Sequence, residues 1–427
     1  MMKRHFCTFT LVSIFLFTVP ALSISADWSR FLGPDGNGIS SETGLADEWS
    51  EDGPKELWSF PLGEGFGSPA IVDGKVYVLD RVNNQQDVMR CIDLESGKEL
   101  WSFGYDAPGR LSYNGSRSIP SVDEEHVYSV GPFGDVYCIS LETHKPVWNR
   151  NLPKEFGGNP PNWGFAHSPV LHNEYVLVAP MSNSAGVVAL NRKTGDVVWK
   201  SPAVGGEAYT TPVVTTIDGV EQILFLTQTQ LSSINPKTGE LFWTWDGYQC
   251  KIPIPSPAPL GEGKFFLTGG YGAGTVIVQV KKDGEDWTIT ELQRIRDDGA
   301  QIHQVTKYDG HLYANFNRNE NISRNPMGLV CMDTQGNIQW STKDDPSMDR
   351  GGFIIVDGKI LALGGESGIL YMLEATPEEV KVLNSAPMFD NLKRRDNTIW
   401  APLALSNGRL IIRNLEVMKC LDLRSGK

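Results

Sequence analysis

Short apolar runs that alternate with polar residues recur along most of this 427-residue chain. A representative unit reads SPAIV at 68–72, turns at Asp73-Gly74 and returns as KVYVL at 75–79. Alternation with a period of two around an Asp-Gly pair is typical of a β-hairpin. No stretch shows a helical period of useful length, and 44 glycines with 26 prolines suit a chain rich in turns. The pattern predicts an all-β fold.

A second hairpin pattern follows the first, and it is repeated along the chain. The segment at 91–103, CIDLESGKELWSF, predicts two strands around a turn, and similar segments stand at 138–148, 189–199, 233–243 and 331–340. Tryptophans close this pattern at Trp58, Trp101, Trp148, Trp199, Trp243 and Trp340. Their spacing of 43 to 51 residues, with one double gap of 97, matches the size of a four-stranded propeller blade.

The two ends of the chain carry complementary halves of the repeat. The last copy starts at Cys420 as CLDLRSGK, and its second half, KELWSF, stands at 55–60. An open solenoid is the alternative, but it would carry atypical capping units at its ends. We therefore predict an eight-bladed β-propeller of four-stranded blades, closed by the N-terminal strand 55–60, which completes the C-terminal blade. The fifth and seventh units lack the closing tryptophan.

The N-terminal region has the composition of a secretory leader. Lys3 and Arg4 precede an apolar run at 6–21, and small residues follow at 23–26. This order predicts a signal peptide at 1–25, with a retained membrane anchor as the alternative. The mature protein would then be periplasmic or secreted, without a membrane span. An extension at 26–54 is expected to pack on the propeller at 55–427.

Charge and cysteine usage narrow the classes of partner and site. The formal net charge of −13 argues against nucleic acid or an anionic membrane as a partner, since both favour a basic face. Four cysteines share one repeat position with smaller residues, which indicates a small, buried packing position and no metal site. The residues at that position include Cys91, Cys138, Ala189, Ser233, Cys331 and Cys420.

The repeat resembles the tryptophan-docking motif Ala-x-Asp-x-x-x-Gly-x-x-x-Trp of pyrroloquinoline-quinone (PQQ) type propellers. In this chain the motif maps onto Cys91, Asp93, Gly97 and Trp101, and onto the corresponding positions before Trp199 and Trp243. The opening WSRFLGPDGNGISSETGL at 28–45 is similar to the start of secreted PQQ-like repeat proteins of planctomycete-type bacteria. The resemblance implies that each indole docks against the neighbouring blade.

Two branches of that family imply two different functions. Quinoprotein dehydrogenases hold PQQ and calcium over the ring axis, whereas non-catalytic members, such as the propeller subunit of the outer-membrane β-barrel assembly machinery, bind proteins. This chain has no adjacent cysteine pair and no Cys-x-x-Cys-His haem motif, and no catalytic Asp with a calcium-binding Glu and Asn carries over. We expect a monomeric, non-catalytic binding or scaffold module for a protein or a small anionic ligand. The alternative is a PQQ-dependent alcohol or sugar dehydrogenase with a divergent, calcium-containing site.

The residues that precede the first strand of each unit are the candidates for a ligand site. They would line the mouth of the central channel as a basic funnel, with aromatic rings to stack a flat anion. Ordinary solvated loop ends, paired with acids such as Glu64 and Asp349, are the alternative. The candidates are Arg117, Trp163, His167, Glu207, Tyr209, Lys251, His303, Arg350 and Trp400, with Phe66 beside them.

Overall fold

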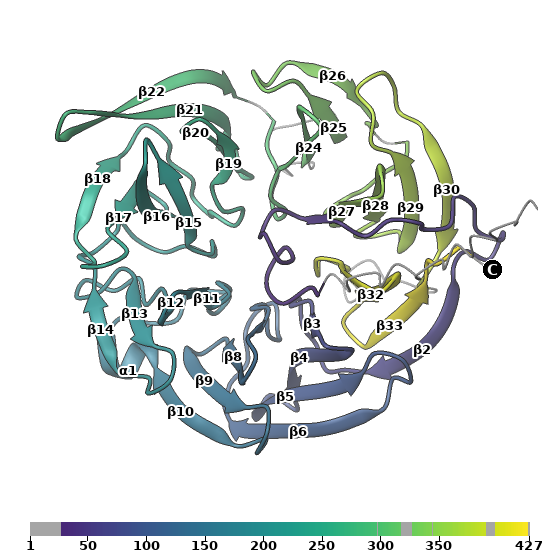
Figure 1. Cartoon of the computed structure of the whole chain (residues 1–427), viewed down its shortest axis with the longest axis horizontal. Coiled ribbons are helices and arrows are strands. Elements are labelled where there is room, and N and C mark those ends of the chain that lie inside the picture. Colours follow the sequence, from purple (N-terminus) through teal and green to yellow (C-terminus); the bar gives the residue numbers. More distant parts are fainter. Residues whose placement is uncertain (1–26, 297, 317–326, 344, 390–397, 426–427) are drawn as a thin grey trace, which may run out of the picture.

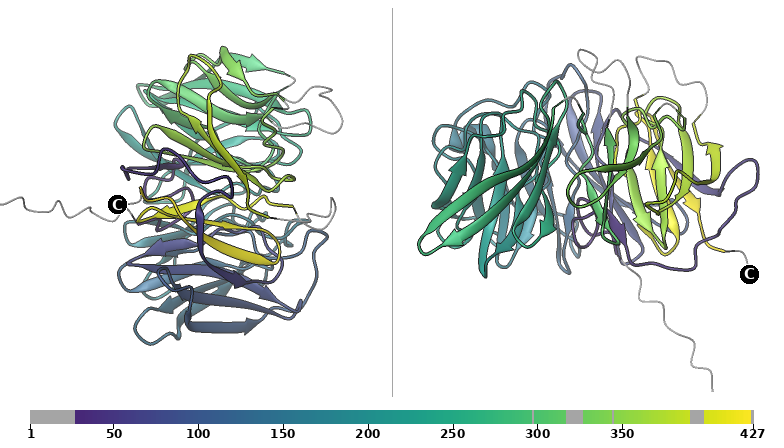
Figure 2. Two further views of the ribbon diagram at one scale, coloured as in Figure 1. Left: turned by 90° about the vertical axis from the view of Figure 1, so that its right-hand side faces the viewer. Right: turned by 90° about the horizontal axis from the view of Figure 1, so that it is seen from above.

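Eight blades of four antiparallel strands surround a central channel in the computed structural model, one of them extended by a parallel fifth strand, so the predicted propeller is confirmed (Figure 1). The structure describes residues 27–425 except 297, 317–326, 344 and 390–397. The predicted leader at 1–25 lies outside the described residues. In side view the sheets pack face to face around the axis (Figure 2). Among the described residues, no helix has the length and apolarity needed to cross a bilayer.

Each blade uses consecutive strands, with the first strand at the channel and the fourth at the rim. Blades one to four comprise β3 (Ala70–Val72), β4 (Lys75–Val82), β5 (Gln86–Asp93) and β6 (Glu99–Asp106); β7 (Ser121–Val122), β8 (His126–Val130), β9 (Asp135–Ser140) and β10 (Pro146–Asn151); β11 (Val170–His172), β12 (Tyr175–Val178), β13 (Val188–Asn191) and β14 (Val197–Lys200); and β15 (Val213–Ile217), β16 (Val220–Leu226), β17 (Leu231–Ile234) and β18 (Leu241–Trp245). Blades five to seven comprise β19 (Ala258–Gly261), β20 (Lys264–Gly269), β21 (Gly274–Asp283) and β22 (Asp286–Ile295); β23 (Thr306–Tyr308), β24 (His311–Phe316), β25 (Gly328–Met332) and β26 (Ile338–Ser341); and β27 (Phe353–Val356), β28 (Lys359–Leu363), β29 (Ile369–Glu374) and β30 (Val382–Pro387). A short helix, α1 (Leu152–Phe156), follows blade two.

Blade eight joins the two ends of the described chain, as predicted. Its strands β31 (Ala404–Ser406), β32 (Arg409–Arg413) and β33 (Val417–Asp422) are completed by β2 (Lys55–Pro61). β2 runs antiparallel to β33, with Trp58 opposite Cys420. The fully buried Arg413 then donates hydrogen bonds to the carbonyls of Gly63 (3.0 Å) and Gly67 (3.2 Å), which lie in the connection to blade one. Backbone pairing and this side chain together link the last blade to the first.

The repeat position shared by cysteine, alanine and serine lies directly opposite the closing tryptophan. Cys91 pairs with Trp101, Ala189 with Trp199, and Cys331 with Trp340. Side chains directly opposite in an antiparallel pair are close neighbours, so an indole leaves room for only a small partner. The five described cysteines are all buried and free, which confirms the predicted packing role.

Most of the closing tryptophans contact the next blade. Gly97, with φ +70°, lies under the Trp58 ring, and a Cβ there would stand 2.5 Å from the indole. Only glycine fits both the left-handed backbone and this close approach. In four places the indole N–H donates to a carbonyl of the following blade: Trp58 to Leu94 (2.9 Å), Trp148 to Arg192 (3.0 Å), Trp199 to Pro236 (3.0 Å) and Trp340 to Thr376 (2.7 Å).

Two tryptophans do not donate to a carbonyl of the next blade. Trp101 stacks on His144, with ring centroids 4.8 Å apart and an interplanar angle of 13°. His144 itself adopts φ 57°, in place of the glycine. Trp243 instead donates to Gln222 Oε1 of its own blade at 3.0 Å. The contacts of each indole therefore vary with the residues in the turn between the third and fourth strands of the next blade.

The N-terminal segment lies inside the central channel, whereas the sequence predicts only that it packs on the ring (Figure 1). Trp28 exchanges backbone hydrogen bonds with Ile71 of β3 (2.8 and 2.9 Å), and the Ser29 carbonyl accepts from Val122 of β7 (3.0 Å). Strand β1 (Ile39–Ser40) then pairs in parallel with β27. The segment thus connects the innermost strands of blades one, two and seven.

Replacing Trp58 with alanine removes the indole contact at the joint between the last and first blades. Truncation of a buried tryptophan lowers the free energy of unfolding by about 3–5 kcal/mol, and we expect a loss in that range from denaturant unfolding. Leu100→Ala is the control, because this side chain is 50% exposed on β6 and its loss is expected to cost under about 0.5 kcal/mol. Equal effects of the two substitutions would contradict a special role for the joint.

Candidate functional site

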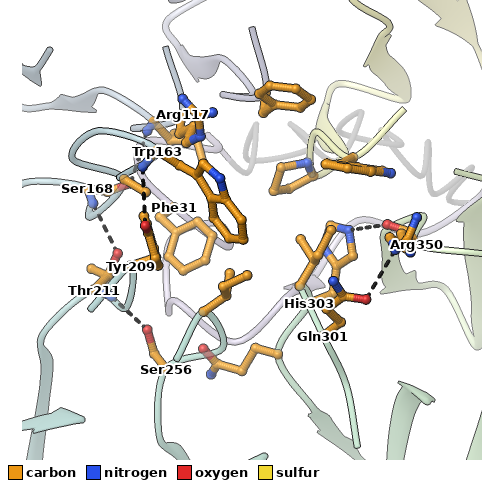
Figure 3. A pocket seen from close by; sticks show the side chains of 18 of the residues that line it. Phe31, Arg117, Trp163, Ser168, Tyr209, Thr211, Ser256, Gln301, His303 and Arg350 are labelled. Carbon is orange, nitrogen blue, oxygen red and sulfur yellow. Dashed lines mark hydrogen bonds between the residues drawn. The ribbon is translucent and has the colours of Figure 1, made fainter. Parts of the chain in front are cut away.

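The loops that lead into the first strands converge on a pocket at one mouth of the channel (Figure 3). All first strands begin at the same end of the ring, so the residues before them face a common space. The pocket encloses a cavity of about 190 Å³. Its lining is aromatic and polar, and includes Phe66, Tyr113, Arg117, Trp163, Ser168, Tyr209, Thr211, Ser256, Tyr271, Gln301, His303, Gln304, Arg350 and Trp400. Among the described residues, no aspartate or glutamate lines it.

Six of the nine residues singled out from the sequence line this pocket, and three do not. Arg117, Trp163, Tyr209, His303, Arg350 and Trp400 line it, together with Phe66.

His167, Glu207 and Lys251 lie outside the lining. The His167 side chain is buried in the protein, where its Nε2 accepts a hydrogen bond from the Ala179 amide at 3.1 Å. Successive side chains point to opposite sides of an extended segment, so Ala166 and Ser168 face the cavity and the histidine between them faces away. Glu207 and Lys251 are exposed on the loops outside the pocket.

Five aromatic rings form a continuous wall along one side of the pocket. Trp400 stacks on Phe66 with centroids 5.4 Å apart, and Phe66 contacts Tyr113 at 6.5 Å. Tyr113 contacts Trp163 at 5.7 Å, and Trp163 contacts Tyr209 at 5.3 Å. These rings come from the loops that enter blades eight, one, two, three and four, and each of these five loops contributes one ring.

Arg117 places a positive charge against this wall. Its guanidinium donates to the carbonyls of Gly115 (2.8 Å) and Tyr113, and its central carbon lies 5.1 Å from the centre of the Phe66 ring. No carboxylate of the described residues pairs with it. Burial lowers the pKa of Arg117 to about 10, so the group remains protonated at neutral pH. The result is a desolvated cation that neutral carbonyls and an aromatic face stabilise only in part.

Arg350 and His303 continue the lining beyond the Trp400 end of the aromatic wall, and the central guanidinium carbon of Arg350 lies 5.5 Å from the centre of the Trp400 ring. Arg350 Nε donates to Gln301 Oε1 at 3.1 Å, and its Nη1 lies 3.4 Å from Glu366 Oε1. His303 Nε2 lies 3.2 Å from the Arg350 carbonyl. Burial lowers the pKa of His303 to about 4, so its ring is neutral at pH 7. Since a carbonyl can only accept, Nε2 carries the proton and Nδ1 keeps a lone pair.

A series of hydroxyl groups joins blades two to five along the inner side of the pocket. The Ile119 amide donates to Ser168 Oγ (3.0 Å), the Ser168 amide to Thr211 Oγ1 (3.0 Å), and the Thr211 amide to Ser256 Oγ (2.9 Å) (Figure 3). Each hydroxyl accepts from the preceding blade, and its own proton can therefore be donated to a ligand. The recurring Ser-Pro and Thr-Pro pairs at 168–169, 211–212 and 256–257 are a sequence signal for this series.

The floor of the pocket comes from a part of the chain that sequence reasoning did not connect with it. Phe31 and Leu32 line the cavity from the N-terminal segment. That segment pairs with the C-terminal parts of β3 and β27, so it reaches the pocket from the opposite end of the channel. The inserted segment closes the channel below the ligand site. No pattern within 28–45 indicates where these two side chains lie.

The family resemblance implies PQQ together with calcium, and the pocket residues fit the first of these but not the second. The aromatic wall and Arg117 suit a planar anion such as PQQ. Calcium requires several oxygen ligands, usually carboxylates among them. The described residues contain no group of three or more His, Cys, Asp or Glu side chains that could hold a metal ion, and the pocket lining itself has no carboxylate. The donor set therefore does not fit a calcium-bound quinone at this position.

Comparison with known proteins gives one family and two kinds of relative. A family model described as outer membrane protein assembly factor BamB matches residues 84–325 and 161–381. The quinoprotein alcohol dehydrogenase PedH of Pseudomonas putida is 26% identical over 168 residues, covering 37% of this chain and 27% of that protein. A 1-butanol dehydrogenase (cytochrome c) of Thauera butanivorans is 31% identical over 110 residues, covering 23% and 15%. The chain thus matches about a quarter or less of the length of these curated relatives.

Solved structures of both kinds share the architecture. The quinohemoprotein alcohol dehydrogenase of Comamonas testosteroni superposes with a TM-score of 0.64 at 14% identity, covering 94% of this chain and 81% of that one. BamB of Moraxella catarrhalis superposes with a TM-score of 0.57 at 11% identity, covering 87% and 98%. At these identities the likeness shows the fold alone.

The two buried histidines make folding sensitive to acid. Burial lowers the pKa of His167 to about 3 and that of His303 to about 4, whereas an unfolded chain has a value near ~6.5. The unfolded state therefore binds more protons between these values, so the free energy of unfolding falls as pH drops from about 6.5 toward 4, by about 1.4 kcal/mol per pH unit for each histidine. Denaturant unfolding between pH 7 and 4.5 measures this slope. His167→Gln is expected to reduce it, while the half-exposed His311→Gln leaves it unchanged, and equal slopes in both variants would contradict the assignment.

Proposed function

The chain belongs to the PQQ-like β-propeller family that includes BamB, and from that premise we propose that it is a non-catalytic binding module acting outside the cytoplasm. The channel mouth holds a small anionic ligand with a flat apolar face. The leader-like composition of 1–25 supports the compartment. The family supports a binding role without selecting it, because relatives of this fold include both assembly factors and dehydrogenases.

The main support for the proposal is the environment of Arg117, which has no carboxylate partner among the described residues. A half-buried cation beside apolar rings is costly unless an anion pairs with it, and within the described residues this one contacts only carbonyls and an aromatic face. A ligand carboxylate would accept charge-assisted hydrogen bonds from the guanidinium while its apolar part covers the aromatic wall. The cavity is concave and combines an aromatic wall with a few polar groups, which is the usual character of a small-molecule site.

The chemistry of the lining favours binding over catalysis. Of the side-chain types in the lining, histidine has the unperturbed pKa that is nearest to neutrality. Burial lowers the pKa of His303 to about 4, however, and its Nε2–H already donates to a carbonyl. A general acid or base works best with a pKa near the working pH. The described part of the lining offers no carboxylate that could serve as a base beside this histidine.

Calorimetric titration of the mature protein tests the proposal. The probes are PQQ with and without calcium, glucuronate and benzoate, with glucose and benzyl alcohol as neutral counterparts. We expect at least one carboxylate to bind, the neutral compounds to bind at least about tenfold more weakly, and Arg117→Ala to lower affinity by about tenfold or more, since a hydrogen bond to a charged group contributes about 1.5–3 kcal/mol.

Arg110→Ala is the matched control, because this arginine is exposed on the same connection and lies outside the pocket. Binding that survives Arg117→Ala, or neutral compounds that bind as well as acids, would contradict the proposal. Dye-linked alcohol oxidation by the protein loaded with PQQ and calcium would overturn its non-catalytic part.

A further inference from the structure

The pocket has two chemically different sides. The aromatic wall, from Trp400 to Tyr209, occupies the entrances of blades eight and one to four. The entrance of blade six contributes the polar side chains Gln301, His303 and Gln304. Arg350 follows from the entrance of blade seven, and Ile254 and Ile302 lie among these polar groups (Figure 3). A ligand that fills the cavity therefore meets flat apolar rings on one side and hydrogen-bonding groups on the other.

The polar groups include both donors and acceptors. His303 Nδ1 has a lone pair, and the Gln304 amide makes no side-chain hydrogen bond to another described residue, so its carbonyl and its NH₂ can both serve a ligand. Ser168, Thr211 and Ser256 each have a hydroxyl proton that is not used in the interblade series. A ligand whose polar groups only accept would leave the two acceptors unpaired, at a cost of about 1–3 kcal/mol each.

A sugar ring matches this division. A pyranose has an apolar face of C–H groups that packs on aromatic rings, and a rim of hydroxyls that each donate and accept. A planar aromatic acid matches the rings and Arg117 but has no hydroxyl for His303 Nδ1 or the Gln304 carbonyl. The positive charge of Arg117, in a lining whose described residues include no carboxylate, favours an acidic group on the ligand and disfavours an amino sugar.

We propose that the anion bound at the channel mouth is a hexuronate, with its carboxylate on Arg117, its C–H face on the aromatic wall and its hydroxyls on His303 and Gln304. This inference rests on the proposed function, because it names the ligand class of the same site. The sugar is a single unit or the terminal residue of an acidic glycan. The cavity of about 190 Å³, with Phe31 and Leu32 in its lining, has the size expected for a single sugar ring.

The test titrates the full mature chain with D-glucuronate, D-galacturonate, a trigalacturonate, D-glucose and benzoate. We expect the uronates to bind at least tenfold more tightly than glucose or benzoate. Arg117→Ala is expected to weaken the uronates at least tenfold, and Arg117→Lys to restore part of that loss. Gln304→Leu is expected to lower the affinity for the uronates and to leave the affinity for benzoate unchanged. A substitution that only disturbed the structure of the pocket would lower both affinities.

Controls separate this inference from the proposed function. Arg110→Ala must bind as the wild type does, and a thermal midpoint for each pocket variant close to that of Arg110→Ala shows that it is folded. Benzoate binding more tightly than any uronate, in an Arg117-dependent manner, would overturn the sugar assignment and leave the anion-binding function intact. If no acid binds in an Arg117-dependent manner, both fail. Tighter binding of the trimer than of the monomers identifies a glycan end, and equal binding identifies a free sugar acid.

Discussion

The pairing of β2 with β33 is the constraint on which the other features depend. A propeller whose first and last blades are not joined has a free sheet edge and can open. With the joint formed, every entrance loop is held between two fixed blades, and Arg413 anchors the loop at the seam itself. The pocket therefore exists in its binding shape before a ligand arrives, which reduces the ordering cost of binding.

Charge is distributed unevenly between the surface and the pocket. The chain carries a formal net charge of −13, yet the described residues that line the channel mouth include two arginines and no carboxylate. At physiological salt, charges more than about 8 Å apart are largely screened in solvent. The acidic surface would therefore have little effect on an anion inside the pocket, and the proposed binding depends on the local contacts with Arg117.

The strand repeats and the entrance loops have separate roles. The repeats bury small residues opposite tryptophans and determine how many blades form, while the loops between blades supply the side chains that face a ligand. The same architecture is therefore compatible with the quinone chemistry of dehydrogenases and with the binding role proposed for this chain. The inserted N-terminal segment adds a third element, because it contacts the first strands and also forms the floor of the site.

Sequence alone determined the features that depend on local pattern. Alternation, turn residues and the spacing of Trp58 through Trp340 gave the blade count, and two half-repeats gave the closure, because each of these is a property of neighbouring residues and of β-pairing. Six of nine candidates reached the pocket for the same reason, since they precede first strands. His167 did not, because the direction of a side chain at a strand entrance depends on the local backbone. Only the tertiary structure placed Phe31 beneath a ligand site, brought Tyr113 between Phe66 and Trp163, and left Arg117 without a carboxylate among the described residues, since these relations arise when distant segments pack together in space.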